Sequence, residues 1–254
     1  MDIGLKGKNV VVTGAAGAIG REICAGFVSN GANVIGADIA DLSETSEYIR
    51  SLGKASQWST SKIDIGSAES VQEECRKIQD RHSEIHALVN NAAIYASLKW
   101  TPMEQLDLKE WDLVMNINVR GLYLMIRELL PALKAAKGKV INFTSDAALR
   151  GGPFMLHYVS YKGAVIGMTR ALSTELGAYG ITVNAVAPGL IDTPSSQSLG
   201  ENYQELLGSV VQSQAIHEPM QSRDMVGTVL YLASSWSDAV TGQLCPVDRG
   251  LVKY

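Results

Sequence analysis

Residues 8–20, KNVVVTGAAGAIG, indicate which fold this chain adopts. Val10, Val11 and Val12 form a short β-branched run that is typical of a buried parallel strand. The run leads directly into a turn of glycines and alanines, and residues 21–30 after it have helical character. In such a unit, small residues let the backbone approach a pyrophosphate, and the helix N-terminus offers N–H groups to it. The stretch therefore predicts a dinucleotide-binding turn, with an ordinary strand-to-helix turn as the alternative.

An aspartate, Asp38, ends the second predicted strand at residues 33–37. It lies 24 residues after Gly14, which suits a carboxylate that binds both hydroxyls of an adenosine ribose. The same carboxylate would repel a 2′-phosphate, and no lysine or arginine follows within the next several positions. Together with the glycine at position 17, these features favour NAD over NADP. A helix cap or a solvated turn is the alternative role for Asp38.

Strands and helices alternate along the rest of the chain, which predicts repeated βαβ units and a parallel sheet. Further strands are expected at 56–63, 87–89, 139–144, 181–187 and 243–247, and helices at 43–51, from 67 onward, and at 106–136, 154–177 and 223–235. The prediction is an α/β protein whose residues 1–254 form a single domain, a Rossmann-type doubly wound parallel sheet of about seven strands flanked by helices. The less regular stretch 193–218 is interpreted as a loop and helix region that covers the substrate.

Polar residues fall at the carboxyl ends of four predicted strands, namely Asp38, Asp64, Asn90 and Ser145. Ligands of open parallel sheets bind at these ends, so we expect the four side chains to line one cleft.

Tyr158 and Lys162 follow Ser145 on one predicted helix. Residues four positions apart share a helix face, so the ammonium of Lys162 is expected beside the phenol of Tyr158. A positive charge there would lower the pKa of Tyr158 from about 10 and make the phenol an acid or base near neutral pH. The alternative for Tyr158 is a structural tyrosine with a buried ring and a solvated hydroxyl. The neighbouring His157 is interpreted as a pocket-wall or surface residue.

Composition and charge exclude other classes of protein. Of the 254 residues, 46% are hydrophobic and 19% charged, which is an ordinary globular balance. No apolar run reaches the ~18 residues of a membrane span, so a soluble protein with no membrane partner is expected. The net charge of −4 without single-sign runs gives no indication of a nucleic-acid partner. The three cysteines lack metal-ligand spacing, so reduced thiols, no metal and a cytoplasmic location are predicted.

Motifs along essentially the whole chain resemble those of the classical short-chain dehydrogenase/reductase family. Besides the turn, whose TGxxxGxG-like sequence begins at Thr13, they are an NNAG-like stretch from Asn90, a Pro188-Gly189 pair and a TGQ…VD terminus. The resemblance implies a catalytic set of Asn118, Ser145, Tyr158 and Lys162. It implies cofactor binding by Gly14, Gly17, Ala18, Ile19, Gly20, Asp38, Asp64, Ile65, Asn90, Ala92, Tyr158, Lys162, Pro188, Gly189, Ile191 and Thr193. It implies a substrate pocket formed by Ile94, Tyr95, Leu149, Phe154 and Leu190.

The resemblance further implies an NAD(P)-dependent short-chain alcohol dehydrogenase that prefers NAD. Its substrate would be a small to medium-sized, mainly apolar secondary alcohol or the ketone, cyclic and aromatic compounds included. Tyr158 would exchange the hydroxyl proton, Lys162 would lower the pKa of the phenol, Ser145 would position the substrate oxygen, and Asn118 would hold a helix kink and a water. An NADPH-dependent ketoacyl-type reductase and a non-catalytic dinucleotide-sensing protein are the alternatives. A homotetramer is the state that the family implies.

Three positions depart from the family pattern. Ala18 stands where the turn usually has its middle glycine, and Ala93 stands at the final glycine of the NNAG stretch. Their methyl groups are expected to weaken cofactor binding without abolishing it. Arg249 replaces a glycine of a VDGG terminus, a segment that often builds subunit contacts in the family.

Overall fold

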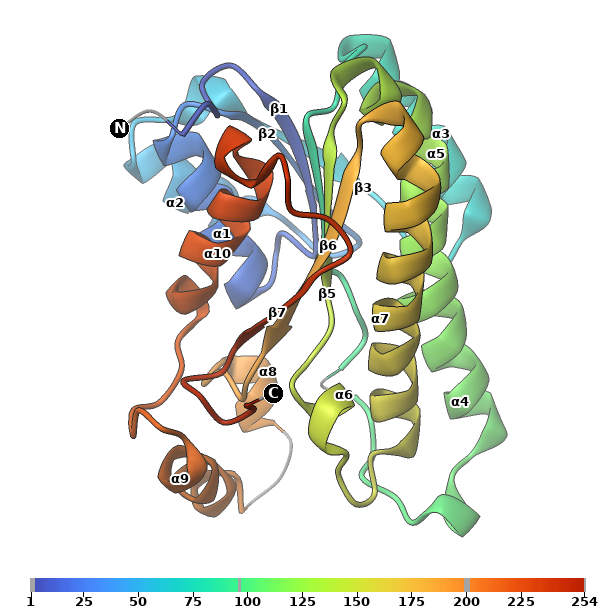
Figure 1. The fold of residues 1–254 in the computed structure, drawn as a ribbon, viewed down its shortest axis with the longest axis vertical. Helices are drawn as coiled ribbons and strands as arrows, with labels where there is room; N and C mark the ends of the chain where they lie inside the picture. Colours follow the sequence, from blue (N-terminus) through green and yellow to red (C-terminus); the bar gives the residue numbers. More distant parts are fainter. Residues whose placement is uncertain (1–2, 96, 199–201, 254) are drawn as a thin grey trace.

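A seven-stranded parallel sheet forms the centre of the computed structural model, which describes residues 3–95, 97–198 and 202–253. The strand order is β3-β2-β1-β4-β5-β6-β7, so the chain winds outward from β1 and β4 in both directions (Figure 1). The strands are β1 Asn9–Thr13, β2 Asn33–Asp38, β3 Trp58–Lys62, β4 Ala87–Asn90, β5 Lys139–Phe143, β6 Thr182–Pro188 and β7 Leu244–Val247. The predicted single-domain, doubly wound Rossmann-type sheet is confirmed.

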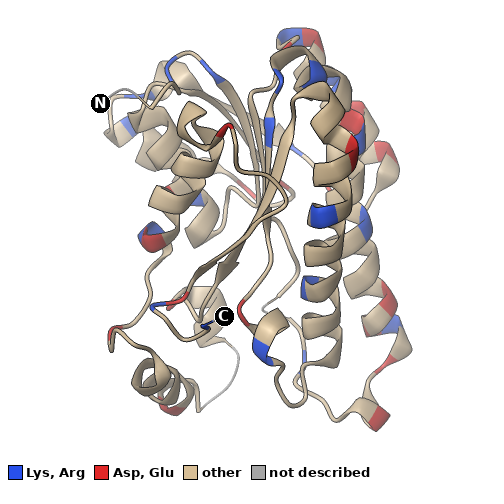
Figure 2. Cartoon of the chain, viewed as in Figure 1, with Lys and Arg blue, Asp and Glu red and all other residues tan. Residues whose placement is uncertain are grey.

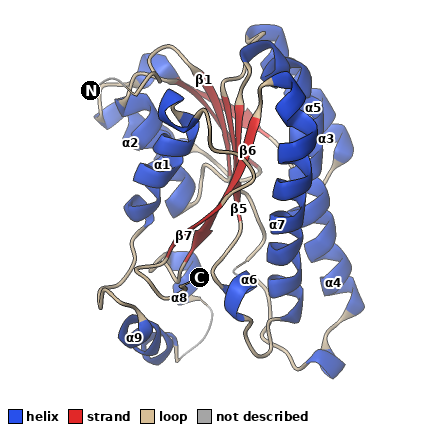
Figure 3. Ribbon diagram, viewed as in Figure 1, coloured by secondary structure: helices blue, strands red, loops and turns tan. Residues whose placement is uncertain are grey.

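Helices cover both faces of the sheet (Figures 1 and 3). One face carries α1 Ala18–Ser29, α2 Ser43–Ser51 and α10 Val226–Ala233, and the other carries α3 Ala68–Arg81, α5 Leu122–Ala136 and α7 Leu156–Leu176. The remaining α-helices are α4 Leu108–Met115, α6 Ala147–Arg150, α8 Pro194–Gln197 and α9 Tyr203–Ser213. Short 3₁₀ turns lie at Ala55–Gln57, Met103–Gln105, Gly177–Tyr179, Ser222–Met225 and Ser235–Ser237.

The valine run of β1 serves two separate hydrophobic cores. Val10 and Val12 pack into the core on the side of α1 and α10, whereas Val11 packs into the core on the side of α3, α5 and α7. Successive side chains of a strand point to opposite faces, so a strand covered on both faces needs apolar residues at every position. Each buried valine stabilises the fold by about 1.5–3 kcal/mol relative to an exposed one.

The long helical region predicted at 106–136 is divided in the structure. A π-helical turn, Asn116–Gly121, separates α4 from α5. Gly121 lies in this turn, where an added Cβ would be 2.5 Å from the carbonyl oxygen of Ile65. Pro131, expected to interrupt the region, lies inside α5 instead. The break therefore occurs where the helix passes close to the end of the third strand, and π-helical turns of this kind are frequent at functional sites.

Helices α8 and α9 lie beyond the carboxyl ends of β6 and β7 (Figure 1) and belong to the stretch 193–218. Residues 199–201 of that stretch lie outside the described residues. Basic and acidic residues are mixed along the outer helices (Figure 2). Among the helices that the structure describes, none combines the length and the apolar character that crossing a membrane requires.

Candidate active site

In the turn after β1, neighbouring atoms lie so close to the backbone that only glycine fits at two positions. Gly14 has a φ of +69°, and a Cβ there would lie 2.7 Å from Nδ2 of Asn91 and 2.9 Å from the backbone of Ala92. At Gly20, a Cβ would lie 2.1 Å from the carbonyl oxygen of Gly14. The amide of Asn91 in turn donates to the carbonyl oxygens of Thr13 and Gly14, at 3.1 and 3.2 Å. The turn is thus fixed against the loop that follows β4.

The start of α1 fits an anionic ligand. Gly17 is the N-cap residue, Ala18 is the first helical residue, and no side chain in the described structure caps this end of the helix. The first turn of α1 also holds no acidic residue. Its N–H groups and the positive end of the helix dipole therefore suit a pyrophosphate. Ile19 and the methyl group of Ala18 lie within the helix itself.

Asp38 lies beside this turn. Its carboxylate accepts hydrogen bonds from the backbone N–H groups of Ala16 and Ala40, both at 2.9 Å. Each oxygen keeps lone pairs that could accept from ribose hydroxyls. Lys62 of β3 is the register partner of Asp38, a neighbour that the sequence prediction missed because it considered only the residues following Asp38.

Three other predicted cofactor residues also lie at strand ends. Asp64 is half-buried and accepts from the N–H of Gly66 at 2.8 Å, and Ile65 is buried. Asn90 is buried and donates to Oδ1 of Asn142 at 2.9 Å, while no described residue gives its own Oδ1 a partner. That acceptor suits a donor on a bound ligand, because buried polar atoms are normally satisfied.

The π-helical turn places Asn118 against the loop after β4. Its side chain accepts from the N–H of Ile94 at 2.9 Å and donates to the carbonyl oxygen of Ile94 at 3.0 Å. Asn118 is buried, and its amide therefore fixes one wall of the predicted pocket.

Ser145, Tyr158 and Lys162 come together where β5 ends against α7. Ser145 and Lys162 are buried, and Nζ of Lys162 lies 6.0 Å from the centre of the Tyr158 ring. The same ammonium donates to the carbonyl oxygen of Phe143 at 2.9 Å. The Tyr158 ring packs between those of Tyr95 and Tyr161, with centroid distances of 5.4 and 5.2 Å.

The structure contradicts the predicted lowering of the pKa of Tyr158. Burial raises the pKa of Tyr158 to about 12, against a smaller lowering by Ser145. Burial also lowers the pKa of Lys162 from 10.5 to about 7. Spacing places the two residues on one helix face, but the depth at which they lie favours the neutral form of each, because burial penalises the charged form.

Of the predicted pocket residues, Tyr95 packs against Tyr158, and Ile94 packs against the same hydrophobic cluster as Tyr158. Ile94, Tyr95 and Leu190 are half-buried, whereas Leu149 and Phe154 are 37% and 54% exposed. Phe154 has a φ of +64°, and α7 begins two residues later than predicted, at Leu156. Sequence reasoning assigned no individual role to the buried carboxylate of Asp146, which follows Ser145 directly.

His157 does not lie at the surface, in contrast to one of the two roles predicted for it. Its side chain is 1% exposed, and its Nε2 lies 2.9 Å from Oε1 of Glu110 on α4. Oε1 of Glu110 also accepts from the N–H of Lys99, so these contacts connect α7, α4 and the loop after β4. A contact between residues 47 positions apart could not be predicted from local spacing.

The predicted cofactor residues Pro188, Gly189, Ile191 and Thr193 lie between the end of β6 and the start of α8. Gly189 donates to the carbonyl oxygen of Val247 at 3.0 Å, and a Cβ on it would lie 3.1 Å from Asp248. Thr193 is the N-cap residue of α8 and accepts from the N–H of Ser196.

Arg249, which follows β7, forms ion pairs and hydrogen bonds with the end of the 193–218 stretch and the residues after it. Its φ is +55°, and its guanidinium forms ion pairs with Glu218 and Asp224, at 2.8 and 3.2 Å. Its carbonyl oxygen accepts from the N–H groups of Ala215 and Ile216. The arginine that replaces the family's glycine therefore makes contacts within this chain.

Comparison with known proteins identifies the family. The model of a family described as Enoyl-(Acyl carrier protein) reductase matches residues 14–252. The 3-oxoacyl-[acyl-carrier-protein] reductase FabG of Thermotoga maritima is 33% identical, over 98% of this chain and 99% of that protein. The chain belongs to the short-chain dehydrogenase/reductase family. Members of this family bind a nicotinamide dinucleotide, and the uncapped N-terminus of α1 and the glycines of the preceding turn fit that ligand.

Solved structures of this family share the fold over nearly the whole chain. A short-chain dehydrogenase/reductase from Brucella melitensis, assigned as a glucose/ribitol dehydrogenase, has a TM-score of 0.90 at 30% identity, covering 100% of both chains. A protein from Beutenbergia cavernae, assigned as an NAD(P)-dependent gluconate 5-dehydrogenase, has a TM-score of 0.91 at 29% identity, covering 99% of both chains. The latter was solved with NADP bound at low occupancy.

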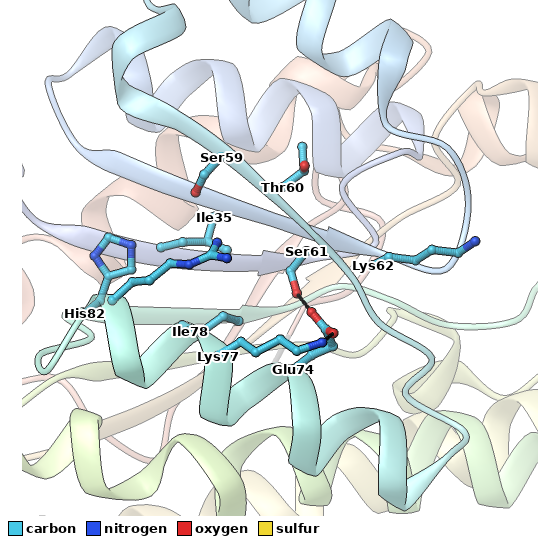
Figure 4. A pocket seen from close by; sticks show the side chains of 10 residues that line it. Ile35, Ser59, Thr60, Ser61, Lys62, Glu74, Lys77, Ile78 and His82 are labelled. Carbon is cyan, nitrogen blue, oxygen red and sulfur yellow. Dashed lines mark hydrogen bonds and ion pairs between the residues drawn. The ribbon is translucent and has the colours of Figure 1, made fainter.

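A separate pocket of this short-chain dehydrogenase/reductase lies between β3 and α3, with a volume of about 210 Å³ (Figure 4). Ser61 donates to Glu74, which also accepts from Lys77, so the charges at its centre compensate each other. None of the predicted site residues lines it. Lys62 is among the residues that line it, and in Figure 4 its side chain extends away from Ser61 and Glu74.

Replacing Lys162 with methionine should stabilise the dinucleotide-free protein, and more at pH 6 than at pH 9. The pKa of Lys162 falls from 10.5 to about 7 on folding. Between these values the unfolded chain binds more protons, so the parent's stability rises with pH, and below pH 7 the parent contains a buried ammonium. We expect a gain of about 1 kcal/mol or more at pH 6 in urea unfolding. Lys109→Met, at an exposed lysine, is the control, and a parent stability that is flat between pH 6 and 9 would contradict the prediction.

Proposed function

We propose that this protein is an NAD-dependent oxidoreductase that interconverts a secondary alcohol and its ketone. The observation that carries the proposal is the meeting of Ser145, Tyr158 and Lys162 at the end of β5. Hydrogen bonds hold the two elements together there, because Oγ1 of Thr144 donates to the carbonyl oxygen of Lys162 at 2.7 Å. A dinucleotide-sensing protein has no need of a phenol and an amine at this place, so the non-catalytic alternative is disfavoured.

A bound nicotinamide dinucleotide supplies the hydride acceptor or donor. In ketone reduction, the neutral phenol of Tyr158 donates its proton to the substrate oxygen, which Ser145 positions. In alcohol oxidation, the phenolate takes the proton from the hydroxyl. Because burial raises the pKa of Tyr158 to about 12, oxidation requires additional positive charge beside the phenol. Lys162 supplies this positive charge when its amine is protonated. Asn118 fixes the loop that borders the site.

The substrate proposal rests on the pocket wall. Tyr95 packs against Tyr158, and Ile94 and Leu190 add partly buried apolar surface. Such a wall favours a small to medium-sized, mainly apolar alcohol, including cyclic and aromatic ones, because apolar contact excludes water from the reacting atoms. Homotetramer formation and a cytoplasmic location stay predictions.

The choice of NAD over NADP rests on Asp38. Wild type is expected to bind NADH at least about tenfold more tightly than NADPH, which corresponds to about 1.4 kcal/mol. Asp38→Ala should narrow this difference, since it removes both the acceptor for the ribose hydroxyls and the repulsion of a 2′-phosphate. Calorimetric titration with both dinucleotides measures the effect.

The matched control is Asp41→Ala, which removes an exposed carboxylate three residues further along the chain. A wild type that prefers NADPH would contradict the role of Asp38 and favour the ketoacyl-type reductase. That alternative has specific support from the 33% identity to a 3-oxoacyl-[acyl-carrier-protein] reductase and from Lys62, the basic residue in register with Asp38.

A further inference from the structure

Asp146 is a buried carboxylate directly beside the predicted catalytic serine. Its side chain is only 4% exposed. Its Oδ1 accepts from Oγ of Ser145 at 3.2 Å, and its Oδ2 accepts from Nε and Nη2 of Arg150 at 3.1 and 2.9 Å. Burying a carboxylate is costly unless it is paired. Burial raises the pKa of Asp146, and the pairing with Arg150 opposes this by favouring the charged form.

The contact with Asp146 restricts what Ser145 can do with its single proton. Oγ of Ser145 accepts from the N–H of Ala147 at 3.2 Å and donates to Asp146. A hydroxyl carries one donor hydrogen, so Asp146 competes for this proton with the phenol of Tyr158, whose pKa Ser145 lowers by hydrogen bonding. Asp146 therefore acts on Tyr158 through Ser145 as well as through its own charge.

The titratable groups around Tyr158 come from several helices, strands and loops. Lys162, Tyr95 and Tyr161 lie next to its ring. Burial is the main cause of the raised pKa of Tyr158, Tyr95 and Asp146. The negative charge of Asp146 adds a smaller increase to the pKa of the two tyrosines, and that of Asp248 at the end of β7 adds one to the pKa of Asp146. Arg150 of α6, 41% exposed, is the cation paired with this carboxylate.

We propose that Asp146 and Arg150 are a pair of positioning residues that fix the proton of Ser145 and balance the charge at Tyr158. The pair was not predicted from the sequence, and the inference rests on the proposed acid–base role of Tyr158. The proposal predicts that neutralising Asp146 and neutralising Arg150 shift the pKa of Tyr158 in opposite directions. Neutralising Asp146 removes a negative charge and leaves Ser145 a weaker competing acceptor, so its proton is donated more readily to the phenolate. Neutralising Arg150 leaves the carboxylate uncompensated.

The test is a spectroscopic titration that needs no substrate. Tyrosinate absorbance near 295 nm is recorded against pH in the parent, Asp146→Asn, Arg150→Gln and the double variant, each saturated with NADH or NADPH, whichever binds more tightly. Subtracting the same titration of a matching protein that also carries Tyr158→Phe isolates the signal of Tyr158. We expect the midpoint to fall by about half a pH unit or more in Asp146→Asn, to rise in Arg150→Gln, and to return towards the parent in the double variant.

The controls are Asp112→Asn on α4 and Arg170→Gln on α7, which remove exposed charges of the same signs. Circular dichroism at each pH shows that every variant is folded. Midpoints that coincide or move in the same direction overturn the inference, as does the lack of any tyrosinate signal up to pH 11 in both the parent and Asp146→Asn. Failure of the proposed function is a separate result, namely a Tyr158→Phe protein that still oxidises cyclohexanol or 1-phenylethanol as fast as the parent.

Discussion

Tyr158→Phe should lose about 10²–10⁴-fold in kcat, while its affinity for the dinucleotide falls by no more than about tenfold. The loss follows from removing the only atom of this side chain that can exchange a proton with the substrate oxygen. Binding is expected to persist because the glycine turn and Asp38, on the other half of the sheet, remain unchanged. The measurement is steady-state oxidation of the fastest secondary alcohol in a panel, together with calorimetric titration of NADH.

Tyr161 provides the matched control for Tyr158, since both lie on α7 and their rings pack against each other. The hydroxyl of Tyr161 is buried, and no described residue offers it a hydrogen-bond partner. Tyr161→Phe should therefore leave kcat within about threefold and leave stability unchanged or slightly higher, because an unpaired buried polar group is costly. A larger loss in Tyr161→Phe than in Tyr158→Phe would contradict the proposed proton donor.

The fold and the placement of the predicted residues follow from local signals. The valine run of β1 indicates a strand covered on both faces, and polar residues at strand ends indicate the edge at which a ligand binds. Asp38, Asp64, Asn90 and Ser145 all lie at this edge in the structure. These inferences succeed because strand periodicity and βαβ connection depend on short stretches of sequence.

What could not be predicted depends on contacts between distant segments. Lys62 becomes a neighbour of Asp38 only through the register of β2 and β3, and the buried His157 contacts Glu110 of another helix. The direction of the pKa shift at Tyr158 also depends on depth below the surface, which spacing does not reveal. Asp146 follows Ser145 in sequence, yet its role required the position of Arg150.

Gly20→Ala should weaken dinucleotide binding by at least about tenfold and lower the free energy of unfolding by about 1–3 kcal/mol. Its Cβ would lie 2.1 Å from the carbonyl oxygen of Gly14 and 2.9 Å from Cα of Ala15. Both contacts are to backbone, so the turn has to shift, and the N–H groups of α1 move with it. The gain of about 1 kcal/mol in helix propensity is too small to offset the clash.

Gly167→Ala is the control that shows the effect of higher helix propensity without a steric clash. Gly167 lies inside α7, where an added Cβ would meet no described atom within 4 Å other than those of its chain neighbours and of the adjacent helix backbone. The variant should therefore gain about 0.5–1 kcal/mol in stability and keep the dinucleotide affinity of the parent. Urea unfolding and NADH titration of both variants provide the comparison. If Gly20→Ala bound NADH as tightly as Gly167→Ala, the pyrophosphate could not depend on the close approach of Gly20 to Gly14, and the role of the turn would have to be assigned elsewhere.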